Sequence, residues 1–479
     1  MTISFRSLYR VVLLGGCAGL STIAHAQQGI TAEDVAALRA EIAALRAQVQ
    51  TLQQRADQAD ADKSAQMAAA PGSSAPAAMA QQATNGSASS TTAPTPATVP
   101  PPVSVAWKSA PQLKQGDWSF KPKGRMQFDT VIVNAPGSVD DNGLGTSTEV
   151  RRLRLGGEGS LPGNFGYKLE AEFSDNKVDL VDAYISWQSG NFGVRLGNQN
   201  QFQSLDELIG DTTGTVMERA AFTDAFNFER RLGIALEWQK GPFLVQGGFF
   251  GDDVNALSAG NGDENNSYGV DGRVVFAPRL GEAQLHFGAS GHWRDLNSTA
   301  DAGVRYRQRP FSHATDSRMI DTGAFGARSE THYGLEFAAV RGRWHTAAET
   351  HWMTADRIGG ADPRFFGGYA EVGYFLTSGD TRTYKNGIFD RSAPKNPVDQ
   401  GGIGSIQLTF RYDYLDLDDR DIRGGKQNGY IGGLVWSPIN YLRFNLNYAH
   451  LDYRDAAIYA GTTRDFGVDV VGLRAEFDY

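Results

Sequence analysis

Three arginines occupy every second position of the segment "VRYRQRPFS", residues 304–312. Arg305, Arg307 and Arg309 would share one face of an extended chain, because alternate side chains of a strand point the same way. A guanidinium group keeps its charge near neutral pH and binds phosphate oxygens in bidentate fashion. This arginine ladder could pass an anion from site to site. The alternative is an exposed loop that pairs with acidic neighbours or with lipopolysaccharide phosphates.

Basic side chains also alternate with apolar ones along several stretches of about ten residues. In a barrel that spans a membrane, apolar side chains face lipid, alternate polar ones face the lumen, and a lipid-facing charge costs about 2–4 kcal/mol at the midplane. We therefore expect these basic side chains to line a pore for anions: Lys121, Lys123, Arg125, Arg152, Arg154, Arg195, Arg231, Arg273 and Arg294. The acidic candidates to pair with them are Glu170, Glu172, Asp182, Glu237 and Asp271.

A long segment, 200–228, separates two of the predicted strands. Loops of this length are usually functional. Folding into the lumen would bury its apolar residues and would place Arg219 near the narrowest point. The alternative is that Glu218 and Arg219 only brace the loop against the barrel wall. The apolar residues concerned are Leu205, Leu208, Ile209, Val216, Met217, Ala220, Ala221 and Phe222.

No motif points to an enzyme, a metal or a cofactor. The chain has neither G-x-S-x-G nor H-E-x-x-H, the signatures of a serine hydrolase and a zinc protease. The histidine pairs 286/292 and 345/351 are each six residues apart on predicted strands, so each pair shares a face, and we interpret them as polar lumen residues. The aspartates of "DLDLDDRD" could bind Ca²⁺, but solvated loop charge explains them as well; they are Asp416, Asp418, Asp419 and Asp421.

The alternating stretches predict an all-β fold, a 16-stranded antiparallel barrel in residues 107–479. Connections alternate between short turns and longer loops, as in outer-membrane barrels. The segment 377–402 is long where a short turn is expected, so it is either a long turn or a sign of misplaced boundaries. The predicted strands are 118–133, 149–160, 164–175, 179–189, 191–200, 229–239, 242–251, 267–277, 282–295, 331–340, 343–353, 366–376, 403–417, 427–437, 441–453 and 466–479.

Three further segments precede the barrel. Residues 1–26 have the basic, apolar and A-x-A regions of a secretory signal peptide, although "LLGGC" also faintly resembles a lipoprotein box at Cys17. Residues 27–63 carry apolar residues at heptad a and d spacing, which predicts a coiled-coil helix. Residues 64–106 are rich in Ala, Ser and Pro and predict a disordered linker.

The composition agrees with an exported protein that does not bind nucleic acid. Cys17, the single cysteine, lies in the leader, so the mature chain needs no disulfide. Loss of the leader changes the formal net charge from −9 to −11, because Arg6 and Arg10 are removed. Such a charge argues against nucleic acid as a partner.

Several long stretches resemble the phosphate-selective porin O and P family. They are "SLDELIGDTTGTVMERAAFTDAFNFERRLGI", "GYFLTSGDTRTYKNGIFDRSAPKNP", "LTFRYDYLDLDDRDIRGGKQN" and "LVWSPINYLRFNLNYAHLDY". The resemblance covers about residues 110–479. It implies a homotrimer of 16-stranded barrels in a Gram-negative outer membrane, reached by Sec-type export. It also implies a third loop folded into each pore, arginines in the outer funnel and constriction, and lysines further in, for phosphate.

The resemblance has two departures. The terminal strand "GLRAEFDY" looks like the signal for the barrel insertion machinery, but it ends in Tyr479 where Phe is commoner. The mature chain has 11 lysines, six of them after residue 123, so its basic groups are mostly arginine. The scarcity of lysine bears on orthophosphate specificity more than on anion preference, and we expect a passive anion channel, most simply for phosphate or polyphosphate. The alternative is a general or cation-preferring diffusion porin whose coiled coil also tethers the outer membrane to peptidoglycan.

Overall fold

The computed structural model of the protein describes residues 102–108, 110–139, 141, 143–255, 267–296 and 303–479. The predicted signal peptide, the predicted coiled coil and most of the predicted linker lie outside these residues. No helix within the described ranges is long and apolar enough to span a membrane.

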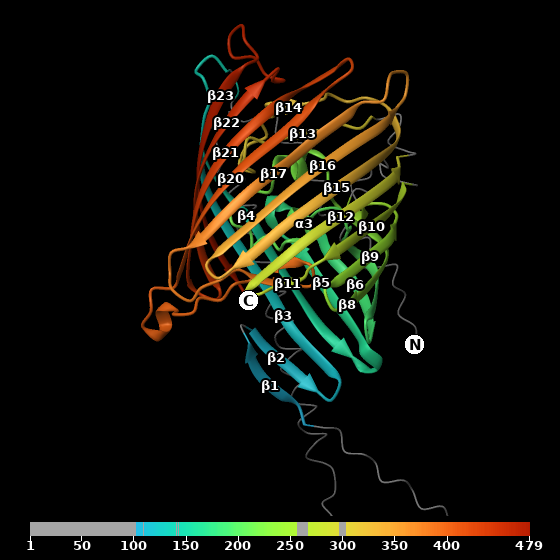
Figure 1. Ribbon diagram of the computed structural model, residues 1–479, viewed down its shortest axis with the longest axis vertical. Coiled ribbons are helices and arrows are strands. Elements are labelled where there is room, and N and C mark those ends of the chain that lie inside the picture. The colour runs from blue at the N-terminus through green and yellow to red at the C-terminus, as the bar shows by residue number, and fades with distance from the viewer. Residues whose placement is uncertain (1–101, 109, 140, 142, 256–266, 297–302) are drawn as a thin grey trace, which may run out of the picture. The chain divides into compact units, whose positions relative to one another are not determined.

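The described residues form a closed barrel of sixteen antiparallel strands (Figure 1), which confirms the predicted fold. Each strand pairs with the next, and the last pairs with the first, so the barrel has no open edge. The strands are β3 (Trp118–Asn134), β4 (Gly145–Leu161), β5 (Phe165–Glu172), β6 (Asp179–Ser189), β7 (Phe192–Asn200), β8 (Arg230–Lys240), β9 (Phe243–Phe250), β10 (Tyr268–Phe276), β12 (Ala283–Asp295), β15 (Ala327–Arg341), β16 (Trp344–Arg357), β17 (Arg364–Phe375), β20 (Ser405–Asp419), β21 (Ile422–Ile439), β22 (Leu442–Arg454) and β23 (Phe466–Asp478).

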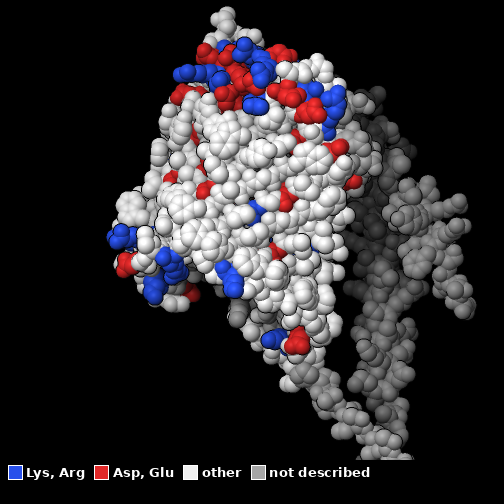
Figure 2. All heavy atoms as spheres, turned by 45° about the vertical axis from the view of Figure 1, so that its right-hand side comes forward, with Lys and Arg blue, Asp and Glu red and all other residues white. Residues whose placement is uncertain are grey.

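The alternation of burial along each strand explains why these residues form a barrel. On β3, Phe128 is 50% exposed whereas its neighbour Gln127 is fully buried. The apolar parity thus faces outward and the polar parity faces the lumen, the reverse of a water-soluble fold. Figure 2 shows the result as a mostly uncharged band between two charged ends of the barrel.

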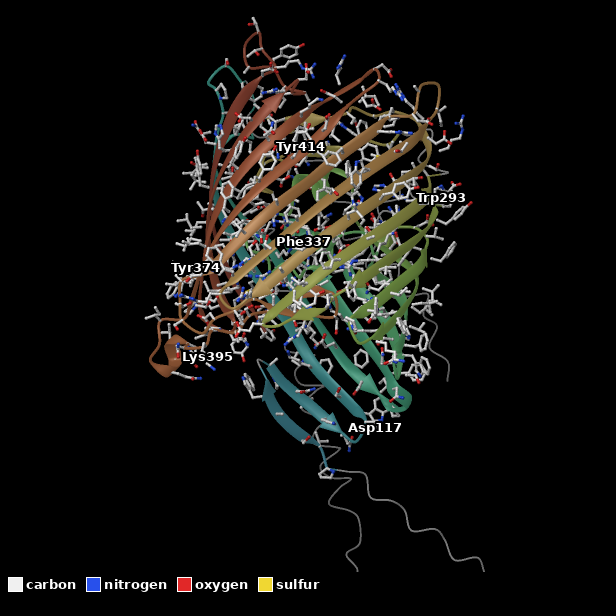
Figure 3. All side chains as sticks on the ribbon, in the orientation of Figure 1. Asp117, Trp293, Phe337, Tyr374, Lys395 and Tyr414 are labelled. Atoms are coloured by element: carbon white, nitrogen blue, oxygen red, sulfur yellow. The ribbon has the colours of Figure 1, made fainter. Side chains whose placement is uncertain are left out.

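Aromatic residues mark both edges of this band. Tyr374 and Trp344 pack together near one end of the barrel wall, with ring centroids 4.5 Å apart. Tyr414 lies toward the opposite end, and Phe337 lies about midway between them (Figure 3). Rings at both edges of an apolar band are typical of membrane–water interfaces.

One end of the barrel carries the tight turns and the other carries the long loops, as predicted. Gly190, Gly241, Gly281 and Gly342 sit in turns at the first end, the turn end, with φ between +55° and +59°. Two-residue turns need such positive φ angles, and glycine adopts them without strain. At the loop end, the predicted loop 418–426 is wrong, since β20 and β21 continue to a two-residue turn at Arg420 and Asp421.

The exceptional segment 377–402 is a genuine long turn, because β17 and β20 flank it where the sequence placed them. It contains the hairpin of β18 (Thr383–Lys385) and β19 (Ile388–Asp390) and the short helix η3 (Val398–Gln400). Gly387 O accepts a hydrogen bond from the lumenal Arg273 (2.9 Å), and Tyr384 Oη lies 2.6 Å from His286 Nδ1. The hairpin therefore enters the lumen, whereas Lys395 lies outside the barrel wall, at the lower left of Figure 3.

Smaller elements complete the fold. A hairpin of β1 (Ser104–Lys108) and β2 (Ala110–Gln115) extends the sheet from β3 at the turn end, so a strand begins within the range assigned to the linker. The two-residue strand β11 (Arg279–Leu280) lies beside β12, and β13 (Arg307–Gln308) pairs with β14 (Ile320–Asp321) in a loop. The short helices η1 (Pro162–Asn164) and η2 (Ser174–Asn176) lie in connections between strands.

We predict that a charge on the apolar band destabilises the barrel. Phe337 is 38% exposed on the outer face of β15, and the change Phe337→Arg should lower the free energy of unfolding by about 2–4 kcal/mol in phospholipid vesicles. Urea unfolding followed by circular dichroism measures this change. Phe337→Leu is the control, since it keeps the site apolar; equal stability of the two variants would show that this face does not contact lipid.

Candidate functional site: a lumen crossed by one loop

Loop three, residues 201–229 between β7 and β8, crosses the lumen to the opposite wall. It contains the helices α3 (Leu205–Leu208) and α4 (Ala221–Ala225). Its backbone bonds to inward side chains of β16, β20, β22 and β23. Of its predicted apolar residues, all are buried except Leu208, which is partly buried. Burial of these side chains offsets the entropy lost when the loop is ordered.

Two carboxylates of the wall hold the helices of loop three. The Glu349 carboxylate on β16 accepts hydrogen bonds from Ser204 Oγ (2.9 Å) and from the backbone N–H groups of Leu205 (2.9 Å) and Asp206 (2.7 Å). The Asp413 carboxylate on β20 accepts one from the N–H of Ala221 at 3.0 Å, at the start of α4. These bonds satisfy backbone donors that a helix start leaves without partners.

Asp211, at the middle of loop three, joins four arginine side chains. Its Oδ2 lies 3.0 Å from Arg125 Nη1, 3.0 Å from Arg152 Nε and 2.8 Å from Arg154 Nη1. Its Oδ1 lies 3.0 Å from Arg219 Nη2. Three of these arginines come from adjacent strands and the fourth from the loop itself, so one carboxylate binds loop three to β3 and β4.

The charge state of Asp211 follows from this environment. Burial alone would raise the pKa of its carboxyl, but the guanidiniums of Arg152, Arg154 and Arg219 hold that pKa well below its usual range. Burial raises the pKa of Glu207 above its usual value of 4.5, although Arg219 opposes the shift. Acidification therefore neutralises Glu207 before Asp211.

Arg219 lies in the lumen as expected, but it is engaged within its own loop. It donates to the carbonyl oxygens of Asp206 and Ile209 and pairs with Glu207, with Nε 3.2 Å from Oε2. Its side chain remains 25% exposed. These contacts favour the bracing alternative over a guanidinium left open to a passing anion.

A β-bulge adds Arg151, which the alternation rule assigns to lipid. The register of β3 and β4 shifts between Gln127 and Phe128, and Arg151 is the extra residue. The bulge turns both Arg151 and Arg152 inward, where Arg151 Nε lies 3.3 Å from Glu218 Oε1. Arg474 on β23 reaches the same Glu218 oxygen at 2.6 Å. Two adjacent arginines in an otherwise alternating strand were the sequence signal for this bulge.

The arginine ladder has the expected alternation. Tyr306 and Gln308 are buried, whereas Arg305 and Arg307 are exposed and Arg309 is partly exposed. Of the three, only Arg309 lines the outer lumenal cavity described below. Arg307 makes no ion pair with any residue that the structure describes.

The other two arginines of the ladder form ion pairs with acidic neighbours. Arg305 Nε lies 2.7 Å from Asp321 Oδ1, and Arg309 Nη2 lies 3.0 Å from Asp316 Oδ1. Hydrogen bonding raises the pKa of Arg305 and lowers the pKa of Asp316. The alternative that the sequence left open, pairing with acidic neighbours, thus holds for Arg305 and Arg309.

Three cavities follow one another along the lumen, with volumes of about 280, 490 and 350 Å³ from the loop end to the turn end. Asp211 and Arg219 border both the outer and the middle cavity. Arg125 and Arg154 border both the middle and the inner cavity. The arginines joined by Asp211 therefore line all three cavities, and three of the four lie where two cavities adjoin.

The balance of charge changes sign along these cavities. Of the described residues, six basic and seven acidic ones line the outer cavity. Seven basic and five acidic ones line the middle cavity, and five basic and three acidic ones line the inner cavity. An excess of positive charge thus begins below loop three, in a low-dielectric channel that focuses the field.

The remaining predicted residues fall into two groups: Lys121, Lys123, Arg195 and Arg273 line the cavities, whereas Arg231 and Arg294 do not. Arg294 Nη1 lies 3.7 Å from Glu330 Oε1. Lys121 and Lys123 line the inner cavity, and Lys123 Nζ lies 3.5 Å from Glu158 Oε1. Arg231 is buried instead, with Nη2 3.2 Å from Glu229 Oε2, and lines none of the three cavities.

Several basic residues that contact loop three are not predicted from the sequence. Arg382 and Arg391 belong to the segment 377–402, and Arg443 belongs to β22. All three donate to loop three: Arg382 to Thr213 O, Arg391 to Thr212 Oγ1, and Arg443 to Thr212 O. Burial lowers the pKa of both Arg382 and Arg391 to about 10. Nothing in the local sequence shows that a long turn reaches the lumen, so only the structure identifies these two.

The chain is similar to a known protein family, to another protein sequence and to two solved structures. A model of the phosphate-selective porin O and P family matches residues 120–479. An uncharacterized protein of Caulobacter vibrioides is 52% identical over 479 residues, 99% of this chain and 96% of that protein. An anion-selective porin from Comamonas acidovorans is 14% identical, with a TM-score of 0.48, and covers 76% of this chain and 100% of its own. The trimer form of OmpT, an outer-membrane protein of Vibrio cholerae, is 10% identical, with a TM-score of 0.48, and covers 76% of this chain and 99% of its own.

We predict that Asp211→Asn loosens loop three. The change removes the carboxylate that four guanidiniums share, and breaking such a buried pair costs about 3–5 kcal/mol. Urea unfolding of the purified protein should show a loss of this size. Asp316→Asn is the control, because the Asp316 side chain is 94% exposed and its pair with Arg309 contributes only about 0–1 kcal/mol. If Asp211→Asn lowers the free energy of unfolding by no more than Asp316→Asn does, Asp211 does not hold loop three to β3 and β4.

We also predict that anion preference increases as the pH falls from about 7 to about 4.5. Protonation of Glu207 removes a negative charge beside Arg219 while Asp211 stays ionised. The reversal potential under a KCl gradient should shift toward that of chloride. Glu207→Gln should abolish the shift, and a shift that persists in this variant would assign it to another group.

Proposed function

The chain belongs to the phosphate-selective porin O and P family of the Gram-negative outer membrane, and we propose that it is a passive channel selective for anions, with phosphate or polyphosphate as its cargo. One observation carries the anion preference: basic residues outnumber acidic ones in the middle and inner cavities. The net acidity of the chain does not oppose this, because selectivity depends on the local potential where the channel is narrow.

Loop three forms the constriction in this proposal. Its residues Glu207 to Asp211, together with Arg219, separate the outer cavity from the middle one. A partly dehydrated anion entering the middle cavity would meet guanidinium groups whose charge Asp211 offsets only in part. Partial offsetting matters, because conduction needs binding sites that hold an ion without trapping it.

The arginine ladder acts as an entry surface in this proposal. Arg307 is exposed and Arg309 lines the outer cavity, so an anion attracted to the loop end would be passed toward loop three. Lys121 and Lys123 then receive it in the inner cavity. We further propose a homotrimer, as the family resemblance implies, and recognition of the β23 strand by the barrel insertion machinery.

The second candidate is a general or cation-preferring porin. The acidic excess in the outer cavity favours it, because the first charges that a solute meets there are on balance negative. A tether from the coiled coil to peptidoglycan is compatible with either channel. The two channels predict opposite signs of the reversal potential.

The deciding measurement is the reversal potential of the purified protein in a planar bilayer under a KCl gradient. We expect a reversal potential of the sign that chloride permeation gives, and a fall in current when millimolar phosphate is added. Lys123→Gln should reduce the anion preference, whereas Lys395→Gln, which removes the same charge outside the cavities, should leave it unchanged. A reversal potential of the sign that potassium permeation gives would overturn the proposal in favour of the cation-preferring porin.

A further inference from the structure

A buried cluster of histidine and acidic side chains lies apart from the three cavities. It occupies the inner face of β10, β12, β15 and β16 and is independent of the proposed function. Within the described part of the chain, His292, Glu330 and His332 each offer one ligand atom, and these atoms lie within 4.8 Å of one another. Glu330 Oε1 is 3.9 Å from His292 Nε2 and 3.7 Å from His332 Nε2. All three residues are buried.

Strand register brings this cluster together from distant parts of the sequence. His292 on β12 stands directly opposite His332 on β15, and Asp271 on β10 stands opposite His292. Glu330 precedes His332 by two residues, so both side chains point inward. The histidines 286 and 292, which share a parity, do not form the cluster; its partners come from neighbouring strands.

The hydrogen bonds around the cluster prepare both imidazoles as ligands. His292 Nδ1 contacts Asp271 Oδ1 and lies 3.2 Å from the side-chain nitrogen of Gln203. Because an ionised carboxylate only accepts, the bond to Asp271 places the hydrogen on Nδ1 and leaves the lone pair on Nε2. His332 Nδ1 lies 3.3 Å from His351 Nε2, a contact in which Nδ1 can donate. Metal-binding histidines almost always have such a partner on the other ring nitrogen.

One buried nitrogen makes no hydrogen bond in this arrangement. His332 Nε2 makes no hydrogen bond with any described residue, and the side chain is only 1% exposed. Buried polar atoms in native structures are normally satisfied. This nitrogen lies 3.7 Å from Glu330 Oε1, so a cation bound between the two atoms would satisfy it.

We propose that His292, Glu330 and His332 bind a divalent transition-metal ion, with Zn²⁺ as the best fit. Two imidazoles and a carboxylate are ligands that zinc accepts, whereas Ca²⁺ and Mg²⁺ prefer oxygen atoms alone. A tetrahedral zinc site places its ligand atoms about 3.3 Å apart. The two Glu330 distances, 3.7 and 3.9 Å, need a small contraction, and all three ligand atoms, which lie within 4.8 Å of one another, must move closer together. Three protein ligands leave a fourth position for water.

The surroundings connect this site to loop three and to the ladder. The rings of Phe226 and Phe228 on loop three lie 6.0 and 5.9 Å from the His332 ring and shield the cluster. Tyr306, which separates Arg305 from Arg307 in the ladder, donates from its hydroxyl to Glu330 Oε2 at 2.7 Å. A bound ion would thus fix Glu330 and, through Tyr306, the position of the ladder.

The test uses the full-length protein in detergent after treatment with a chelator, with Zn²⁺ alone as the probe. Competition against a chromophoric chelator should give one saturable site per chain. Glu330→Gln and His332→Gln should each lower the affinity at least about 100-fold, and Asp271→Asn, which removes a partner of His292, about 10- to 100-fold. His450→Gln is the matched control, because His450 pairs with Asp452 and Asp469 at a partly exposed position, and its loss should leave the Zn²⁺ affinity unchanged.

A second measurement needs no variant. Co²⁺ bound to the wild-type protein should give the visible absorption of a tetrahedral site, and Zn²⁺ should displace it while Mg²⁺ should not. The proposal is overturned if the wild-type protein binds neither ion saturably. It is equally overturned if the Glu330 and His332 variants, folded by circular dichroism, bind Zn²⁺ as tightly as the wild type.

Discussion

One buried carboxylate, Asp211, holds together the groups on which the lumen depends. Four guanidiniums from β3, β4 and loop three converge on it at 2.8–3.0 Å. Without a negative charge at their centre, these arginines would repel one another in a low-dielectric space. This cluster around Asp211 therefore has two effects: it secures loop three to the barrel wall, and it allows basic side chains to gather where the cavities adjoin.

The cluster around Asp211 also sets how much charge a passing ion meets. Each arginine joined to Asp211 is partly neutralised, and Glu170, Glu172 and Glu207 pair with two of them in addition. A lumen lined by arginine is thus not equivalent to a strongly positive lumen. The surplus lies below loop three, where Lys121 and Lys123 add charge at the turn end. Moderate surplus charge suits a channel, because an anion held too firmly would not leave.

Much of the barrel interior is packed rather than open. Loop three enters from the loop end and the β18–β19 hairpin enters from the turn end, and both bury apolar side chains such as Phe222 and Phe389 against the wall. Aromatic rings of loop three cover the histidine cluster, which separates it from the cavities. The wall therefore carries two kinds of polar cluster: arginines and carboxylates beside the cavities, and buried histidines behind the loop.

The sequence by itself determined the barrel, because lipid outside and water inside impose a two-residue alternation that local residues reveal. All sixteen strands lie close to their predicted positions, and the inward parity of Lys121, Lys123, Arg125, Arg152 and Arg154 follows from the same rule. What only the tertiary structure decided is which inward groups meet. Asp211 finds Arg125 and Arg154 across the lumen, a bulge brings Arg151 inside, and His292 faces His332 through strand register. Alternation fixes the side of the wall on which a residue lies, but contacts between distant segments depend on register and on the path of the loops, and neither leaves a local pattern in the chain.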